Sequence, residues 1–318
     1  MAEQPTFADL AWAAKGKITR REKFLTEMNA VIPWRKFLER IEPHYPKPGK
    51  GRRPLGLEKM LRIYFLQQWF DLSDPGAEEA LYDSESMRRF VRIDLSEDVI
   101  PDESTILQFR HLLEQHQLTE ALFVEVNALL EKHGVFIRTG TIVDATIIDA
   151  PRSLKNRDQQ RDPEMGSTQK ARTWHFGMKV HLGTDRQGLV HSISVTSASV
   201  LELNEIGSLL HGEEREVFGD KAYSSQELQQ QAEAQGIRYR VNRRGHRHGK
   251  LPAHWQRKNR RRSQIRARCE YPFLVVKRLW GFRKVRYRGL AKNRARVYAA
   301  FALANLYMVR RRFQGKQA

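Results

Sequence analysis

The sequence predicts an α/β protein in which an all-helical N-terminal part precedes a mixed sheet flanked by helices. Apolar residues recur at helical spacing as far as about Gly134. From Gly140 onward, β-branched segments alternate with helix-like segments, as in a sheet covered by helices. With 318 residues, 40% of them hydrophobic, the chain can bury a core in each part. We therefore expect a helical domain over residues 1–135 and an α/β domain over residues 136–318.

Three segments of the first part are typical of amphipathic helices. Residues 56–70 carry apolar side chains three and four positions apart. Residues 102–115 start with capping residues and place a second apolar stripe on one face. Thr119 is a plausible N-cap for a third helix, which Gly134 ends. These stripes indicate that the helices pack against one another.

The second part opens with "GTIVDATIID" (residues 140–149), which is typical of a buried strand. Residues 151–174 are polar and predict a long loop. Two strand-like segments then meet near residues 186–188 and predict a hairpin. The segments after the hairpin alternate between helix and strand: a helix over 201–210, a short strand before Asp220, a helix over 226–236, a strand over 237–244, and basic helices from about Pro252.

The charge of the chain predicts a polyanionic partner. The formal net charge is +19, and residues 236–296 hold 22 Lys and Arg against one acid, Glu270. Charge concentrated in this way favours nucleic-acid binding over a generally basic surface. Within this stretch, Arg260, Arg261 and Arg262 are expected to contact phosphates.

Cysteine content and hydropathy indicate a cytoplasmic protein. The one cysteine, Cys269, excludes an internal disulfide framework. The N-terminus lacks the basic head and apolar core of a secretory signal. The longest apolar run, residues 297–309, is shorter than a membrane span and contains Asn305. We expect a soluble protein that binds no membrane.

Three carboxylates are candidates for a metal site. Asp144 lies in an apolar strand, where a charge is costly unless it is paired or bound to a cation, and Asp220 repeats this situation. Either aspartate alone could be an ordinary hydrogen-bonded residue. Together with Glu270 they would repel one another unless divalent cations bind, and oxygen ligands select Mg²⁺ or Mn²⁺. Two such ions about 4 Å apart suit phosphodiester displacement. Asp149 is a rival to Asp144, but strand alternation puts it on the opposite face.

Cationic and aromatic residues surround the third carboxylate. Ser263, Arg266 and Lys277 lie at −7, −4 and +7 from Glu270, so a continuous helix would carry them on one face. Arg266 and Lys277 would then stand near the metals and bind phosphates. Pro272 interrupts helical hydrogen bonding, which makes the shared face approximate. Trp174, after the polar loop, either stacks on a base flipped from a DNA end or belongs to the core.

These blocks resemble the DDE transposases of bacterial insertion sequences, specifically the fourth and fifth insertion-sequence families and most closely the fifth. The third block of those families reads Tyr-x2-Arg-x3-Glu-x6-Lys, and this chain has Ser263, Arg266, Glu270 and Lys277 at that spacing. "VDATIIDAP" and "FGDKAYSS" are similar to the first two blocks. The chain departs from the pattern at Ser263, which replaces the tyrosine.

The resemblance implies an RNase H-like catalytic domain with Asp144, Asp220 and Glu270 as catalytic metal ligands. Only 50 residues separate Asp220 from Glu270, so no large inserted domain is expected there. The N-terminal helices would recognise terminal inverted repeats and assist assembly into a homodimer or higher multimer on double-stranded DNA. The protein would act on the bacterial nucleoid, joining element ends to target DNA.

Two other functions stay open at this level. A metal-dependent nuclease of the same fold would cut DNA without joining a 3′-OH to a target. A decayed copy would bind DNA without catalysis, although the presence of all three acids argues against it.

Overall fold

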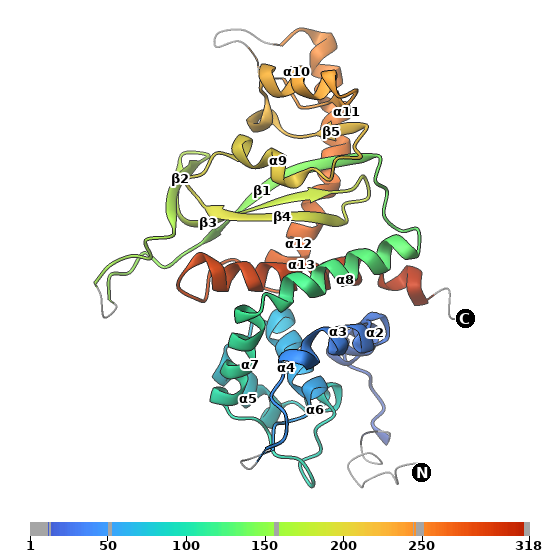
Figure 1. Ribbon diagram of the computed structural model, residues 1–318, viewed down its shortest axis with the longest axis vertical. Helices are drawn as coiled ribbons and strands as arrows, with labels where there is room; N and C mark the ends of the chain where they lie inside the picture. The colour runs from blue at the N-terminus through green and yellow to red at the C-terminus, as the bar shows by residue number, and fades with distance from the viewer. Residues whose placement is uncertain are drawn as a thin grey trace.

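The computed structural model describes residue 12 and residues 14–49, 53–155, 159–243, 245 and 251–314. Figure 1 shows the N-terminal helices at one end of an elongated molecule and the sheet near its middle. Helices α8 and α13 cross the molecule between these two parts, and α9, α10 and α11 lie toward the far end. The predicted order of a helical part followed by an α/β part is therefore confirmed.

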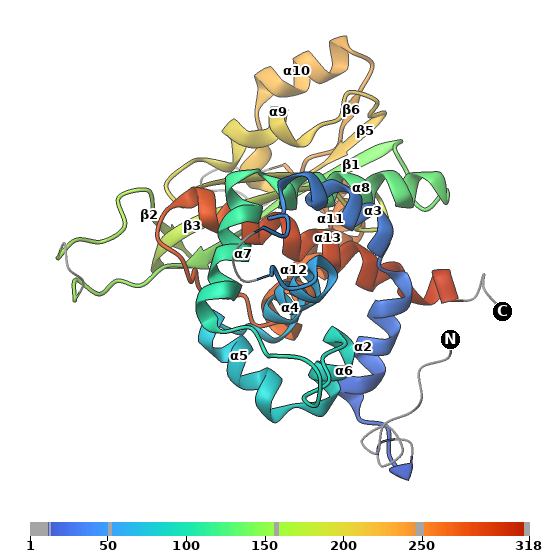
Figure 2. The same ribbon diagram turned by 60° about the horizontal axis from the view of Figure 1, so that its bottom comes forward.

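Seven α-helices precede the sheet within the described residues. Helix α4 (Leu57–Phe70) lies at their centre, with α2, α5, α6 and α7 around it (Figure 2), and its residues from Met60 to Trp69 are all buried. This burial explains why α4 is apolar on nearly every side. The other six helices are α2 (Arg20–Val31), α3 (Trp34–Ile41), α5 (Asp74–Asp83), α6 (Glu85–Val91), α7 (Glu103–Gln115) and α8 (Leu118–Lys132).

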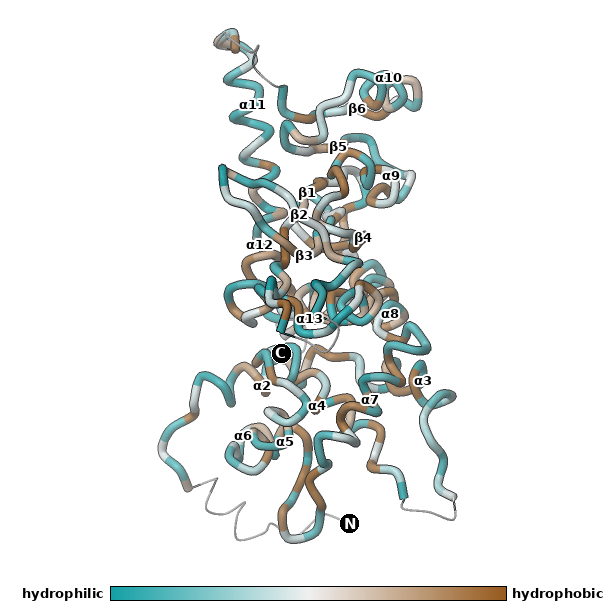
Figure 3. The backbone as a smooth tube through the Cα atoms, turned by 90° about the vertical axis from the view of Figure 1, so that its left-hand side faces the viewer, coloured by the Kyte–Doolittle hydropathy of each residue, from teal (hydrophilic) through white to brown (hydrophobic). Residues whose placement is uncertain are grey.

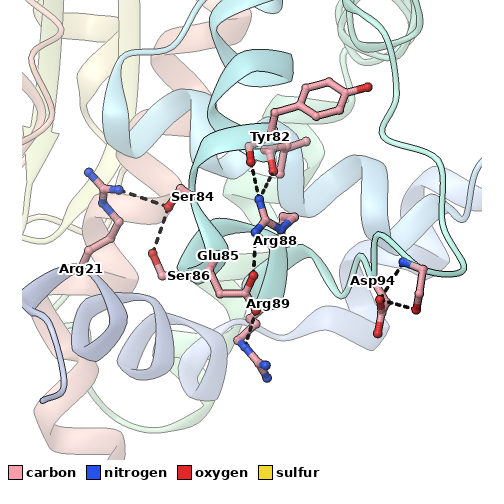
Figure 4. Close-up of polar contacts among 10 residues, drawn as sticks. Arg21, Tyr82, Ser84, Glu85, Ser86, Arg88, Arg89 and Asp94 are labelled. Carbon is pink, nitrogen blue, oxygen red and sulfur yellow. Dashed lines mark hydrogen bonds and ion pairs between the residues drawn. The ribbon is translucent and has the colours of Figure 1, made fainter. Parts of the chain in front are cut away.

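A polar network fixes the sharp turn between α5 and α6 (Figure 4). Arg88 donates to the carbonyl oxygens of Leu81 and Tyr82, at 2.9 and 2.5 Å, and to Glu85 at 2.6 Å. These carbonyls belong to the last turn of α5, where no amide of the same helix can satisfy them. Arg21 of α2 donates to Ser84 at 3.2 Å and ties the turn to the first helices.

The sheet has six strands in the order β2-β3-β1-β5-β6, with β4 also paired to β3. Strands β1, β3 and β4 are antiparallel, whereas β5 and β6 run parallel to β1. An antiparallel meander extended by parallel strands is the RNase H-like arrangement that the family resemblance implied. The strands are β1 (Gly140–Asp149), β2 (Gly166–Lys170), β3 (Thr173–Thr184), β4 (Val190–Ser197), β5 (Glu216–Phe218) and β6 (Arg238–Tyr239).

Three details of the predicted elements were wrong. The expected loop over 151–174 contains β2, a polar strand that pairs with β3 through a turn in which Ala171 and Arg172 have positive φ. Because β2 is an edge strand, it needs no alternating apolar pattern. The expected helix over 201–210 is a 3₁₀ turn (Glu202–Glu205) followed by the single turn α9 (Ile206–Leu209). Of the expected strand over 237–244, the described residues 237–243 include only the two residues of β6 in a strand.

The C-terminal helix packs against both the N-terminal helices and the sheet. Helix α13 (Leu290–Gln314) packs against α8 and also against α2, α4 and β4. One cluster of buried apolar side chains extends from Leu25 in α2 through the sheet to Val309 in α13. The division into domains at residue 135 stays a prediction, because shared packing does not test whether either part folds alone. None of the described helices is both long and apolar enough to cross a membrane.

Candidate active site

Asp144 projects from β1 into a largely desolvated position. Its register partner on β3 is Leu182, so the two side chains share a face of the sheet. The Asp144 side chain is 16% exposed, and its Oδ2 accepts a 2.8 Å hydrogen bond from Nη1 of Arg266. Burial raises the pKa of Asp144, and the Arg266 charge opposes this shift. The neighbouring Arg266 cation therefore favours the ionised form of this carboxylate, against the effect of burial.

Asp220 lies near Asp144 because their strands are adjacent. Strand β5 runs parallel to β1, with Ile142 opposite Phe218, and Asp220 follows two residues later. Its Oδ1 accepts from the Ala222 amide at 2.7 Å and caps a 3₁₀ turn. The charge of Asp220 contributes to the raised pKa of Asp144, so the two carboxylates interact. A cavity of about 630 Å³ opens beside Asp220.

Glu270 begins α12 (Glu270–Leu274). This short helix lies within a longer helical run that starts with α11 (Ala253–Arg266). The turn between β3 and β4 fixes the backbone just before it. Gly188 has φ +90°, and a Cβ there would come within 2.4 Å of the Arg268 carbonyl oxygen. Arg268 donates in turn to the Arg186 carbonyl at 2.8 Å. Close packing of the hairpin turn thus places Glu270, whose side chain is 61% exposed.

The helix type changes on both sides of the segment that contains Pro272. A 3₁₀ turn (Ala267–Cys269) separates α11 from α12, and a π-helical segment (Val275–Leu279) follows α12. Pro272 lies in the first turn of α12, where a missing amide is tolerated. The run therefore continues past the proline, but its geometry differs from that of a single α-helix.

The predicted proximity of Arg266 to Glu270 is confirmed, whereas Ser263 and Lys277 have other hydrogen-bond partners. Nη2 of Arg266 donates to Oε1 of Glu270 at 3.3 Å. Lys277 instead donates to Thr146 Oγ1 and the Ile147 carbonyl on β1, at 2.9 and 2.7 Å. Because a π segment adds a residue per turn, it rotates Lys277 relative to an α-helical projection. Ser263 accepts from Asn242 at 3.0 Å.

The donor chemistry fits a hard divalent cation, but the side-chain arrangement is built around an arginine. Asp144, Asp220 and Glu270 offer only carboxylate oxygens, which Mg²⁺ and Mn²⁺ prefer. Among the described residues, no three His, Cys, Asp or Glu side chains converge closely enough to hold one ion. Arg266 lies between Asp144 and Glu270 and bonds to both.

A basic helix leads to this site. Helix α11 has no acidic residue and no buried residue, and Figure 3 shows it hydrophilic along most of its length. Arg260 and Arg261 are exposed, and Arg262 is half-buried, donating to the Val241 carbonyl at 2.5 Å. A cavity of about 420 Å³ adjoins the helix, and its cationic lining residues are Arg186, Arg240, Lys258, Arg261 and Arg262.

Two tryptophans beside basic segments differ in exposure. Trp174 is 60% exposed at the start of β3, and its carbonyl accepts a hydrogen bond from Arg152. Trp280 is 5% exposed and packs on Tyr307, so it belongs to the core. Asp149 lies on the face opposite Asp144, as predicted, and pairs with His175 at 2.9 Å.

One acidic residue near the site gave no signal in the sequence. Glu202, in the 3₁₀ turn after β4, has a pKa raised mainly by burial, and the charges of Asp220 and Asp144 add to the shift. Its carboxylate lies 3.9 Å from Nζ of the buried Lys179. A single glutamate in a predicted helix has no pattern that marks it, so only the fold reveals this proximity.

Family comparison supplies the identity of the chain. Residues 136–306, more than half of the chain, match the family described as "Transposase DDE domain", and residues 13–112 match "Transposase domain (DUF772)". The chain belongs to the DDE transposase family. The resemblance to bacterial insertion-sequence enzymes is therefore confirmed, as is the prediction of a DNA transposase. Membership implies that the transposase acts on DNA and depends on a divalent metal ion.

Two solved structures resemble the transposase weakly. One chain is from the crystal structure of the Mos1 Strand Transfer Complex, with 13% sequence identity and a TM-score of 0.29. The match covers 94% of this transposase and 97% of the Mos1 chain. The other is from the Mos1 mariner paired end complex with Mn, with 14% identity, coverage of 88% and 84%, and a TM-score of 0.26. At such TM-scores the likeness carries no argument about this transposase.

Proposed function

We propose that the transposase cleaves DNA at the terminal inverted repeats of an insertion sequence and joins the freed 3′-OH to target DNA. The observation that carries this proposal is the meeting of the three sequence blocks. Asp144 and Glu270 bond to one guanidinium, and Asp220 interacts electrostatically with Asp144. Water attacks the phosphodiester in the first step, and the 3′ oxygen leaves as a hydroxyl. In the second step that hydroxyl attacks a target phosphodiester, forms a new P–O bond and expels the target strand's 3′ oxygen as a hydroxyl.

Asp144, Asp220 and Glu270 would hold the divalent cations, which we propose to be two Mg²⁺ or Mn²⁺ ions. Such ions stabilise charge on the attacking and leaving oxygens of a phosphodiester displacement. The half-buried Asp144 and the exposed Glu270 come from different elements, so the proposed ligands would reach the cations from β1 and from α12.

Cationic side chains would position the DNA. Arg260, Arg261 and Arg262 on α11 are proposed to follow the phosphate backbone toward Glu270. Arg266 and Lys277 are proposed to contact the phosphate at the cleaved bond. The exposed ring of Trp174 is proposed to stack on a base displaced from the DNA end.

The remaining partners follow from the same reaction. We propose that residues 1–135 bind the terminal inverted repeats and assist multimerisation, and that residues 136–318 form the catalytic domain. Pairing two element ends requires a homodimer or higher multimer. The site of action would be the bacterial nucleoid in the cytoplasm.

The test is single replacement of each carboxylate by its amide: Asp144→Asn, Asp220→Asn and Glu270→Gln. Each variant should lose about a hundredfold to a thousandfold in cleavage of an end-containing duplex with Mg²⁺, the scale of losing one electrostatic catalytic group. Full activity of any variant would remove that residue from the site. Asp149→Asn is the matched control and should retain cleavage, because Asp149 lies on the opposite face.

Strand transfer with pre-cut ends separates this function from the alternatives. A nuclease of the same fold would cleave and fail to join the ends. A decayed copy would bind the duplex and do neither.

A further inference from the structure

We propose that Arg266 is a resident counter-cation that holds Asp144 and Glu270 in the metal-free transposase and is displaced when a divalent ion binds. Displacement would then free the guanidinium to bind a DNA phosphate. This inference rests on the proposed function, because it takes Asp144 and Glu270 as metal ligands.

The first argument is geometric. Two nitrogens of one guanidinium bond to carboxylates from separate elements: Nη1 to Asp144 on β1 at 2.8 Å, and Nη2 to Glu270 on α12 at 3.3 Å. The planar fork of arginine suits two acceptors at once. The Arg266 side chain is 23% exposed and Asp144 16% exposed, so solvent screens this pairing only partly.

The second argument is competition for the same oxygens. A metal bound by Asp144 and Glu270 would use the carboxylates that Arg266 now occupies. A guanidinium and a divalent cation cannot share that position, because their charges repel one another. The absence of a three-ligand cluster among the described side chains agrees with carboxylates spaced for the arginine.

The third argument is that Arg266 is incompletely bonded. Its Nε is buried and has no hydrogen-bond partner. A buried donor without a partner costs free energy, and the guanidinium therefore loses less on leaving than its two ion pairs alone suggest. Arg266 is the last residue of α11, so a released side chain remains beside the basic face proposed to bind DNA.

The experiment measures Mn²⁺ binding to the full-length, DNA-free protein by electron paramagnetic resonance. Arg266→Gln should bind Mn²⁺ about tenfold more tightly than the wild type, a change of about 1.4 kcal/mol. Lys277→Gln is the matched control, because it removes one charge beside β1 without removing a bond to either carboxylate. Its Mn²⁺ affinity should stay within about threefold of the wild type.

Unfolding temperatures with and without Mn²⁺ provide a second readout. Since a ligand that binds the folded state raises its stability, Mn²⁺ should raise the midpoint more in Arg266→Gln than in the wild type. If Arg266→Gln does not fold, Arg266→Lys replaces it. A lysine ammonium has no planar fork to span both carboxylates, so this variant should also bind Mn²⁺ more tightly.

Unchanged or weaker Mn²⁺ binding in the Arg266 variant would overturn the inference. Equal tightening in Lys277→Gln would also overturn it, because the effect would then be one of general charge. Asp144→Asn and Glu270→Gln separate a failure of the proposed metal site from a failure of the proposed displacement. If neither weakens Mn²⁺ binding, the proposed metal site fails. If both weaken it while Arg266→Gln leaves the affinity unchanged, only the displacement of Arg266 is wrong.

Discussion

At the scale of single residues, Cys269 shows how sharply the environment changes beside the candidate active site. It precedes the exposed Glu270 by one position, yet it is 0% exposed. Burial raises the pKa of its thiol, and the charges of Asp144 and Glu270 add to the shift. The thiolate is therefore scarce, and the sulfur cannot be reached from solvent.

We expect Cys269 to resist alkylation in the folded protein. Iodoacetamide at pH 8 should label the native chain at least about tenfold more slowly than the chain in urea, because the thiolate is the reactive form. Mass spectrometry after timed quenching measures the labelled fraction. Equal rates in the two states would show that the thiol is open to solvent.

Residue spacing predicted part of the site because some contacts are local. Arg266 and Glu270 are four positions apart, and a helix brings such residues together. Lys277 could not be placed in this way, because its partners are on β1 and the intervening π segment alters its direction. Glu202 was invisible for a similar reason, since only the fold places it near Asp220.

At the scale of elements, β1 and β3 are held unusually close. A Cβ on Gly177 would come within 2.1 Å of the Ile148 carbonyl oxygen and 2.9 Å of the Ala150 amide. These are backbone atoms that cannot rotate away. Glycine at this position therefore lets the strand that carries Asp144 pair fully with β3.

Gly177→Ala should lower the free energy of unfolding by about 2–3 kcal/mol, the scale of an overpacked core. Gly207→Ala is the matched control, because nothing lies within 4 Å of the Cβ it would add. Because Gly207 lies in helix α9, where alanine is favoured over glycine, that variant should raise the free energy of unfolding by up to about 1 kcal/mol. Urea titration of both variants measures the difference, and similar values would refute the close contact.

The buried face of β3 also predicts a pH dependence. His181 is 0% exposed, and burial lowers its pKa to about 4, from an ordinary value of 6.5. The Glu205 charge opposes this shift and Lys179 adds to it. The unfolded chain therefore binds more protons between pH 6.5 and 4, so this residue's stabilisation is full above pH 6.5 and is lost as pH falls toward 4.

Between pH 7 and pH 4.5 the wild type should lose about 2 kcal/mol more stability than His181→Gln, which has no titrating ring. Denaturant unfolding at the two pH values gives this difference directly. A wild type and a variant with parallel pH profiles would mean that the His181 ring is solvated.

Element prediction succeeded where periodicity was strong. Strand β1 and helices α4, α7 and α8 follow from their apolar spacing. The prediction missed strand β2 because its residues are polar. As an edge strand, β2 is held by hydrogen bonds to β3 alone. The expected helix over 201–210 is shorter because the single turn α9 is enough to bury Ile206 and Leu209 against the sheet, while Leu201 is exposed.

At the scale of the whole molecule, charge and packing are separated. The largest apolar cluster joins the N-terminal helices, the sheet and α13, whereas α11 projects a basic surface beyond it (Figure 1). Part of the net charge of +19 is therefore concentrated on α11, outside the core-forming helices. This separation leaves α11 free to bind a polyanion without altering the core.

The salt dependence of DNA binding tests this separation. Each phosphate contact contributes about 0.9 to the slope of log K against log salt, because a bound cation releases a counterion. Replacing Arg260, Arg261 and Arg262 by glutamine should therefore reduce the slope by up to about 3. Three exposed cations of α13 form the control: Lys292, Arg311 and Arg312. Their replacement removes the same charge outside α11 and should change the slope by less than about 1. Fluorescence anisotropy of a labelled duplex across a salt series measures both. Equal slopes for the two triple variants would mean that the net charge, and not the face of α11, determines binding.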